Sequence, residues 1–299
     1  MKQCIFLLIL IANVPSGKAE DVRFTEVVVP FTLNEQGHIL FHAKFNGIEG
    51  KFIFDTGAGI NLVTKKFADR IKELSPEGGL FTGFRATGDR LDMQLYKVHE
   101  LSIGSWSITD PLLTWMDQNW GEIDGIISLK NFEKDVIITI DYTASTLTIS
   151  PKAGFAALKK SATASFPIQL DDTRGISVDM FCYVRINHGP VLQFSMDSGS
   201  GKDVLRINQH FMAELHIDST DSAHVSRTVQ PSEFKSGYSN VMYNTKIDEL
   251  AVSGSQSLTW QHPRAQFTDG LIYDGIMSIN WMGRKITINI PDKEMAVWR

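Results

Sequence analysis

The sequence predicts a mostly β protein built from two related units. Three observations support this prediction. A short phrase containing an acidic residue occurs twice, at Asp55 and Asp197, each time at the end of an apolar strand. The segments around the two phrases repeat in the same order, as expected for an internal duplication. Short alternating runs bounded by Gly, Asn and Asp dominate both halves, which is typical of strands and turns.

The two units can be followed strand by strand. In each, a short strand leads through a Gly turn to an alternating strand, a hairpin turn and the strand that delivers the Asp. The matched segments, first unit then second, are 29–34 and 166–171, 38–45 and 176–186, and 46–47 and 187–190. The nine residues that start at Asp55 then align with the nine that start at Asp197 without a gap.

The repeat continues downstream of these phrases. Asp55 precedes the Asp-Gly pair at Asp124 by 69 residues, and Asp197 precedes the one at Asp274 by 77 residues, a difference of loop size. The later matches are 101–104 with 250–254, 123–129 with 273–279, and the closing strand pairs 136–141 and 146–149 with 285–290 and 295–298. We therefore expect an N-terminal lobe at 20–150, a linker at 151–164 and a C-terminal lobe at 165–299.

Helix-like periodicity is confined to two short stretches. Residues 64–74 place Phe67, Ile71 and Leu74 at helical spacing. The segment 208–215 is a candidate counterpart after the second Asp. Both stretches follow the strand after an acidic phrase, so we expect one short helix in each lobe.

The composition excludes several classes of function. The chain has 299 residues, of which 43% are hydrophobic and 21% charged, as in ordinary soluble globular proteins. Its formal net charge of −5 provides no basic footprint for nucleic acid or an anionic membrane. The charges are dispersed along the chain, so they predict solubility and not a particular partner.

The first 19 residues have the pattern of a signal peptide. Lys2 supplies a positive start, the apolar run 4–14 is too short to span a bilayer, and Gly17 and Ala19 are small residues where signal peptidase cuts. An uncleaved anchor is the open alternative. Cleavage would remove two lysines and no acid, so the net charge would become −7.

Cysteine usage indicates the compartment. Only Cys182 remains after residues 1–19 are removed, and one thiol forms no internal disulfide. Export without bridges is more typical of bacteria than of eukaryotic secretion. We therefore expect a bacterial-type periplasmic or extracellular protein, with no membrane association once the signal is cleaved. Cys182 itself lies in a strand-like run and is expected to be a buried small hydrophobe.

The paired acidic phrases predict a chemistry. If the two units pack about a pseudo-twofold axis, Asp55 and Asp197 face each other. Two carboxylates that close share one proton, so one can act as a base toward water while the other donates to a peptide carbonyl oxygen. Gly57 and Gly199 then let the backbone approach the carboxylates. Hydroxyls of Thr56 and Ser198 are placed to hydrogen-bond across the axis.

Ala58 and Ser200 break the symmetry of this site. We expect the Ser200 hydroxyl to donate a hydrogen bond to a carboxylate and lower its pKa, which Ala58 cannot do. A site with a hydroxyl on one side only should have a less acidic pH optimum than a site with two. A profile that peaks below about pH 3 would contradict this expectation.

These motifs resemble the aspartic peptidases of the pepsin and retropepsin group. Asp-Thr-Gly-Ala at 55–58 has the retropepsin form, Asp-Ser-Gly-Ser at 197–200 is similar to a pepsin second lobe, and 126–128 and 276–278 resemble the strand behind each catalytic loop. The resemblance covers nearly the whole chain after the signal. It implies an acid-protease fold of two β-barrel-like lobes with the active cleft between them and one catalytic Asp per lobe. It also implies no metal, no organic cofactor and a peptide or protein substrate.

The resemblance also implies a hairpin flap over the cleft, and 81–91 is where it would fall. No Tyr stands at the expected flap tip, so Arg85, Thr87 and Gly88 are the candidates for substrate contact. Trp115, Trp120 and Tyr273 are candidates either for pocket walls or for core filling.

Two main readings of function remain open. The first is an aspartic endopeptidase, and the alternative is a catalytically silent peptide- or protein-binding member of the same fold. We expect a monomer because the short linker favours pairing of lobes within one chain, although pairing between two chains is an alternative. The glycines at 199–201 fail the phosphate-loop pattern, and His38 and His42 lack metal-site spacing on a helix.

Overall fold

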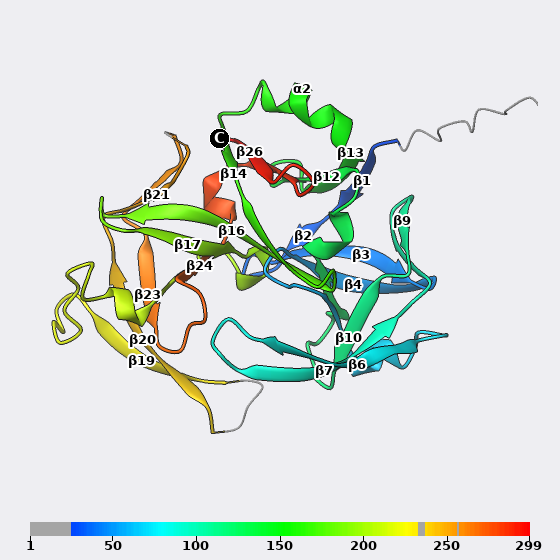
Figure 1. Ribbon diagram of the computed structural model, residues 1–299, viewed down its shortest axis with the longest axis horizontal. Coiled ribbons are helices and arrows are strands. Elements are labelled where there is room, and N and C mark those ends of the chain that lie inside the picture. Colours follow the sequence, from blue (N-terminus) through cyan, green and yellow to red (C-terminus); the bar gives the residue numbers. More distant parts are fainter. Residues whose placement is uncertain (1–24, 233–236, 256) are drawn as a thin grey trace, which may run out of the picture.

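The computed structural model describes residues 25–232, 237–255 and 257–299. The predicted signal peptide at 1–19 lies outside the described residues, so its prediction is not tested. Within the part of the chain described, no helix is long and apolar enough to cross a membrane. The fold is mostly β with two lobes, which confirms the predicted fold class. Figure 1 shows the two lobes side by side, with a further sheet above them.

The N-terminal lobe is a ten-stranded sheet. Strand β2 (Thr32–Leu33) pairs with β3 at its side. The main path runs β6 (Ser75–Phe84), β7 (Arg90–Lys97), β10 (Leu112–Met116), β5 (Asn61–Thr64), β11 (Gly125–Ser128), β4 (Ile48–Asp55), β3 (Ile39–Phe45), β8 (Glu100–Ile103), β9 (Trp106–Thr109).

The C-terminal lobe repeats this sheet position by position. Strand β15 (Gln169–Thr173) pairs with β16 as β2 does with β3. The main path runs β19 (Ser226–Pro231), β20 (Ser239–Lys246), β23 (Arg264–Thr268), β18 (Leu205–Asn208), β24 (Gly275–Met277), β17 (Val191–Met196), β16 (Ser177–Ile186), β21 (Glu249–Val252), β22 (Thr259–Gln261). Among the described residues the end strands of each path do not pair with each other, so the sheets are open and not closed barrels.

The strand registers correct one detail of the predicted repeat. Leu62 on β5 lies opposite Ile126, and its counterpart opposite Ile276 is Arg206 on β18. Leu62 is seven residues after Asp55, whereas Arg206 is nine residues after Asp197. The ungapped alignment was therefore wrong beyond the turn, because the second turn holds two extra residues. Asp203, in that turn, has the left-handed φ of 57°.

A third sheet is formed by both halves of the chain. Its six strands run β1 (Val27–Pro30), β13 (Thr146–Pro151), β12 (Val136–Asp141), β25 (Lys285–Asn289), β26 (Glu294–Trp298), β14 (Ala164–Pro167). The halves meet where β12 pairs with β25, and there the buried hydroxyls of Thr139 and Thr287 are 2.8 Å apart. This sheet joins the lobes by backbone hydrogen bonds, so it fixes how they face each other.

Helical structure is scarce, as the sequence predicts, but shorter than expected. The segment 64–74 holds only α1 (Lys65–Ala68), capped by the Thr64 hydroxyl, and then continues with tight i−3 bonds such as Arg70 N–H to Phe67 O. At 208–215 only the 3₁₀ turn η4 (Gln209–Phe211) forms. The other 3₁₀ turns within the two lobes are η1 (Leu129–Phe132), η3 (Ser198–Ser200) and η5 (Asn280–Met282).

The segment that was expected to be a linker covers the third sheet. It contains η2 (Lys152–Gly154) and α2 (Phe155–Lys159), seen above the sheet in Figure 1. Phe155 is buried against Ile137 and Ala296, one residue from each half of the sheet. The connection is therefore short and packed, which holds the lobes at a fixed distance from each other.

Alternating burial along the strands forms the core of each lobe. In the N-terminal lobe Phe45, Phe52 and Phe67 pack edge to face, with ring centroids 5.2 to 6.1 Å apart. Such arrangements satisfy the quadrupoles of the rings while burying their area. Cys182 is buried on β16, as expected for a small hydrophobe. These rigid sheets carry the loops that hold the acidic residues.

Candidate active site

Asp55 and Asp197 lie at equivalent strand ends in the two lobes. Asp55 is the last residue of β4, where it lies beside Ser128 of the parallel strand β11. Asp197 follows β17 directly and caps η3, with its side chain accepting from Gly199 N–H. The strand that delivers each Asp is buried on both sides, so the carboxylates are placed by backbone pairing and not by a mobile loop.

Thr56 and Ser198 tie the two loops together by a reciprocal pattern. The Thr56 hydroxyl accepts from Ser198 N–H at 3.0 Å and donates to Met196 O at 2.7 Å. The Ser198 hydroxyl accepts from Thr56 N–H at 3.0 Å and donates to Phe54 O at 2.9 Å. All four bonds cross between the lobes and are buried, so they hold the two Asp residues in register. This is the cross-axis contact that the sequence predicted.

The site has no room for a side chain at Gly57 or Gly199. A Cβ on Gly57 would lie 2.4 Å from Asp197 Cγ, and one on Gly199 would lie 2.2 Å from Asp55 Cγ. Each glycine N–H also donates to the carboxylate of its own loop at 2.8 Å. Any side chain at either position would push the carboxyl groups apart, so the close approach of the pair depends on both glycines.

The two carboxyl groups are in direct hydrogen-bond contact, and their environments differ. Burial raises the pKa of Asp55, while the hydrogen bond from Asp197 and the N–H groups of Gly57 and Ala58 lower it. Burial, followed by the negative charge of Asp55, raises the pKa of Asp197 well above its ordinary value. Asp197 is therefore the group that holds the shared proton, and Asp55 is the group that ionises first.

The hydroxyl of Ser200 does not act as the sequence suggested. It donates to the backbone carbonyl of Asp197 at 2.8 Å, and not to a carboxylate. Ala58 contributes its backbone N–H to Asp55 and its carbonyl oxygen to the Ser128 hydroxyl. Neither carboxylate thus has a serine hydroxyl that stabilises its charge. The expected pKa-lowering contact of Ser200 is absent because its side chain closes the turn instead.

The two carboxyl groups lie in a cleft of about 680 Å³ lined by both lobes. Residues from the two lobes give it apolar walls, among them Leu62, Met93, Met116, Trp120, Met242 and Tyr273. Of the three aromatic candidates, Trp120 and Tyr273 line the cleft. Trp115 instead stacks on Tyr96 with centroids 6.4 Å apart. Polar and apolar side chains share the lining, and a cleft with convergent polar groups is the usual form of a ligand site.

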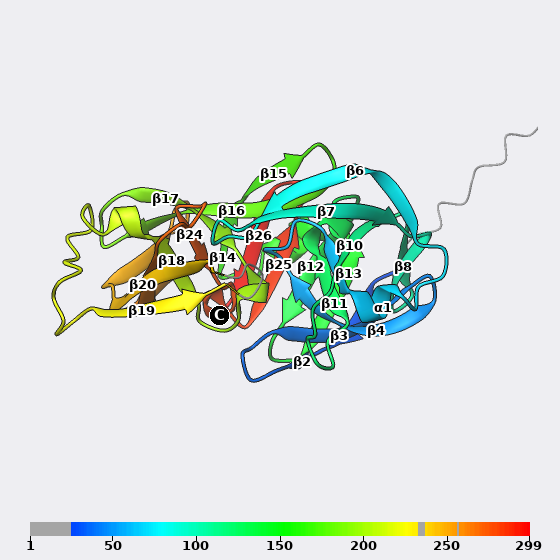
Figure 2. The same cartoon turned by 90° about the horizontal axis from the view of Figure 1, so that it is seen from below.

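The expected flap is the hairpin formed by β6 and β7. Figure 2 shows this hairpin extending from the N-terminal lobe toward the C-terminal lobe. Arg85 and Thr87 line the cleft, as the sequence suggested for substrate contact. Gly88 does not line it; its φ of +86° makes the turn, and a Cβ there would lie 2.8 Å from Gly270 O. The role of Gly88 is thus to let the flap approach the other lobe.

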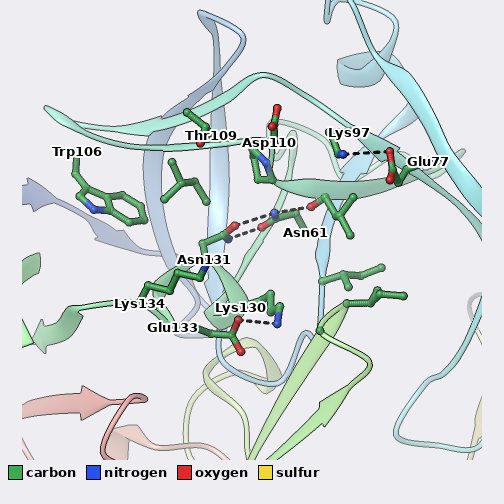
Figure 3. A pocket seen from close by; sticks show the side chains of 16 residues that line it. Asn61, Glu77, Lys97, Trp106, Thr109, Asp110, Lys130, Asn131, Glu133 and Lys134 are labelled. Carbon is green, nitrogen blue, oxygen red and sulfur yellow. Dashed lines mark hydrogen bonds and ion pairs between the residues drawn. The ribbon is translucent and has the colours of Figure 1, made fainter. Parts of the chain in front are cut away.

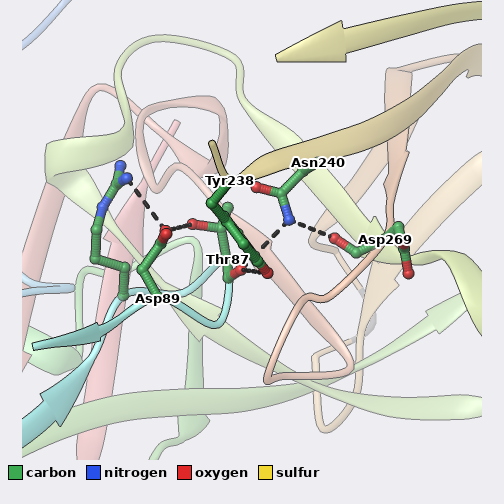
Figure 4. A network of polar contacts seen from close by, with 6 residues as sticks. Thr87, Asp89, Tyr238, Asn240 and Asp269 are labelled. Atoms are coloured by element: carbon green, nitrogen blue, oxygen red, sulfur yellow. Dashed lines mark hydrogen bonds and ion pairs between the residues drawn. The ribbon is translucent and has the colours of Figure 1, made fainter. Parts of the chain in front are cut away.

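The flap tip is bonded to the C-terminal lobe (Figure 4). Thr87 O accepts from the Tyr238 hydroxyl at 3.0 Å and from the Asn240 amide at 3.3 Å. Ile272 N–H donates to Ala86 O at 3.0 Å. Within the tip, the Thr87 hydroxyl donates to Asp89 at 2.9 Å. We call these three bonds between the lobes the flap latch, because they hold the hairpin closed over the cleft.

Sequence analysis missed three features of the cleft. The hairpin β19–β20 is the C-terminal counterpart of the flap and contributes Gln230, Pro231 and Asn240 to the lining. Arg206 and Asp179 also line the cleft. The repeat itself held the signal for all of them, because each stands at the position of a cleft residue in the first unit. Finding the β19–β20 hairpin and Arg206 required the two-residue shift, and finding Asp179 required the pairing of β16 with β17.

A second cavity of about 430 Å³ lies beside the main cleft (Figure 3). Four of its charged residues form ion pairs, Lys97 with Glu77 at 3.3 Å and Lys130 with Glu133 at 2.6 Å. The Asn131 amide donates to the Asn61 side chain at 2.7 Å. Asn61 in turn accepts from Ser128 N–H behind the Asp55 loop. These hydrogen bonds in the wall of the cavity support the Asp55 loop from behind.

Comparison with known proteins agrees with the geometry. Residues 41–131 match a family model described as aspartyl protease, and this segment contains Asp55. Basic 7S globulin from soybean has a similar structure, with a TM-score of 0.48 and 11% identity over 91% of this chain and 94% of that chain. No curated protein sequence matches the chain. Residues 41–131 are therefore similar to aspartyl proteases, and the acidic loop of the second lobe repeats the geometry of the first.

Proposed function

We propose that this protein is an aspartic endopeptidase that hydrolyses peptide bonds with water activated between Asp55 and Asp197. The observation that supports this most is the buried, hydrogen-bonded pair of carboxyl groups at the floor of a cleft lined by both lobes. Two carboxyl groups whose environments push their pKa values apart divide the roles of acid and base. Asp197 is the acid of this pair and Asp55 the base.

The reaction proceeds by general acid–base catalysis without a covalent enzyme intermediate. Ionised Asp55 takes a proton from water as the water oxygen attacks the carbonyl carbon of the peptide. Protonated Asp197 donates its proton to the carbonyl oxygen, which gives a neutral geminal diol. The proton held by Asp55 then passes to the peptide nitrogen, the C–N bond breaks, and a hydroxyl proton of the diol returns to Asp197.

The protein acts as a single exported chain in this proposal. Each lobe of one chain supplies one Asp, and the shared sheet through β12 and β25 sets their separation. A monomer therefore has a complete site. The pattern of residues 1–19 supports export to a periplasmic or extracellular space, where the substrate is a peptide or protein.

The proposal is tested by incubating the purified protein with a mixed peptide library across pH 3 to 8 and identifying the cut sites. We expect internal cleavages that a statine-type transition-state analogue inhibits and that disappear in Asp55→Asn. Asn is nearly isosteric with Asp, so circular dichroism should show the variant folded. If the folded wild type cuts nothing at any pH but retains peptides from the library, the protein is a silent peptide-binding member of the fold.

A further inference from the structure

Asp179 is a third carboxylate in the cleft that the proposed mechanism does not use. It lies on β16 and lines the cleft together with Asp55 and Asp197. One of its carboxylate oxygens is 3.6 Å from the position that a Cβ on Gly59 would occupy, so it lies beside the loop that follows Asp55. The group is half-buried and faces the space where a substrate would lie.

The two charges that act most on Asp179 are both negative. Asp171 stands directly opposite it on β15, and Asp55 contributes a second negative charge from β4. Burial raises the pKa of the Tyr273 phenol, and the nearby charges of Asp179, Asp171 and Asp197 raise it further. Within residues 25–232, 237–255 and 257–299, no ion pair involves Asp179 or Asp171. Burial, followed by the charge of Asp171, raises the pKa of Asp179 to about 6.

The pseudo-twofold axis places a residue of different charge at the equivalent position. Leu40 lies opposite Ile53 and Phe181 opposite Ser195, so His38 is the counterpart of Asp179. His38 also lines the cleft, beside the loop that follows Asp197. The Asn34 amide donates to His38 Nδ1 at 3.1 Å, because the Asn34 oxygen is already bonded to His38 N–H. This leaves His38 Nε2 as a donor.

The cleft therefore has the Asp179 carboxylate, which attracts cations, at one of two equivalent positions. The hydrogen-bond donor His38 Nε2 stands at the other. A site made of two similar halves would bind a peptide backbone equally well in two opposite directions. Different groups at equivalent positions remove this ambiguity, because a side chain that suits one end does not suit the other. An unpaired, partly buried carboxylate in a cleft is also characteristic of a functional site.

We propose that Asp179 is a specificity-determining residue that selects substrates with a Lys or Arg side chain on one side of the scissile bond. This inference rests on the proposed peptidase function of the same cleft. An ammonium or guanidinium group there would make charge-assisted hydrogen bonds with Asp179. The cation would relieve the repulsion between Asp179 and Asp171. The same position on the other side of the bond faces His38 and has no such preference.

The test uses a peptide that the wild type cleaves, with Lys, norleucine or Glu substituted at each position on either side of the cut. We expect Lys to exceed norleucine in kcat/KM by about tenfold or more at one position at pH 7, as one charge-assisted contact allows. The ratio should shrink toward pH 5, where Asp179 is protonated. It should be lost in Asp179→Asn and turn in favour of Glu in Asp179→Lys.

Asp172→Asn is the matched control, because Asp172 is the neighbour of Asp171 on the same hairpin but lies within 3.8 Å of Lys130 and does not line the cleft. This variant should keep the preference for Lys. Equal kcat/KM for Lys and norleucine at every position in the wild type would overturn the inference while leaving the peptidase function intact.

A binding measurement separates the two proposals. The same labelled peptides are titrated into Asp197→Asn, and into Asp197→Asn combined with Asp179→Asn, by fluorescence anisotropy. If the wild type cleaves none of the peptides, the peptidase function fails, and the Lys-to-norleucine ratio of Kd values still tests Asp179. A ratio that is unchanged by Asp179→Asn contradicts its role whatever the outcome for catalysis.

Discussion

At the scale of single residues, two glycines and one missing hydrogen bond determine the geometry and the charge of the site. The missing side chains of Gly57 and Gly199 allow the carboxyl groups to approach, and the missing hydroxyl contact leaves both carboxylates without serine donors. Burial therefore dominates the electrostatics and raises the pKa of both Asp55 and Asp197. The residues that touch the reacting atoms are few, and their neighbours determine which one carries the proton.

Asp179 gives a stability prediction at this scale. Its pKa is about 6 in the folded protein and 3.8 without the fold, so the folded state binds its proton more tightly. The contribution of Asp179 to stability is therefore fully present below about pH 4 and is lost as the pH rises through 6. Asp179→Asn should raise the free energy of unfolding by about 2 kcal/mol at pH 7.5 relative to its effect at pH 4.

Urea unfolding of wild type and Asp179→Asn at both pH values measures this difference. The comparison between pH values removes any pH-independent effect of the substitution itself. Equal differences in unfolding free energy at pH 4 and pH 7.5 would mean that Asp179 titrates normally and is not held in an acidic, partly buried position.

At the scale of elements, the hairpins decide access to the cleft. The flap β6–β7 is closed by the flap latch, in which Tyr238, Asn240 and Ile272 of the other lobe bond to Ala86 and Thr87. The flap can lift away from the cleft only when these bonds break. Their number is small and each is partly replaceable by water, so opening should be frequent on the timescale of catalysis.

Tyr238→Phe should loosen the flap latch. It removes the hydroxyl that donates to Thr87 O but keeps the ring, and a hydrogen bond of this kind contributes about 0.5–1.5 kcal/mol. We expect the amide of Ile272, which bonds to the flap, to exchange its hydrogen about two- to tenfold faster. Exchange at Ile288, in the sheet between the lobes, serves as the internal control. An unchanged rate at Ile272 would show that Tyr238 does not hold the flap.

The elements also show which parts of the fold could be predicted from the sequence. Both hairpins that deliver Asp55 and Asp197 were predictable because turn residues and alternating apolar positions are local signals. The flap at 81–91 was placed by the resemblance to aspartic peptidases. The β19–β20 hairpin and Arg206 were missed because two extra residues in the second turn displaced the repeat. The helix expected at 64–74 was shortened because Phe67 and Ile71 reach the core equally well from a 3₁₀-type turn.

Site geometry was predictable only in part. The reciprocal hydrogen bonds between Thr56 and Ser198 followed from the duplication, since a pseudo-twofold axis brings equivalent positions together. The contact of Ser200 did not, because a hydroxyl one turn away can bond either to a side chain or to its own backbone. The equivalence of Asp179 and His38 about the pseudo-twofold axis was not predictable either, because only the pairing of the strands shows it.

At the scale of the whole molecule, the six-stranded sheet holds the two lobes in register. Thr139 and Thr287 share a buried hydrogen bond of 2.8 Å where β12 meets β25. Thr139→Val leaves the Thr287 hydroxyl unsatisfied and should reduce the free energy of unfolding by about 1–3 kcal/mol. The double variant with Val at both positions should lose less than the sum of the two single variants. Chemical denaturation of all four proteins gives this coupling, and additive losses would contradict it.

The central claim is that Asp55 and Asp197 together activate water, and a pH profile of kcat/KM for one cleaved peptide tests it most directly. The account predicts a bell-shaped profile between pH 3 and 8 that peaks above about pH 4, because both pKa values are raised. Asp197→Asn should lower kcat by about 10³-fold or more while remaining folded. A folded Asp197→Asn variant that cleaves the peptide as fast as the wild type would contradict the claim.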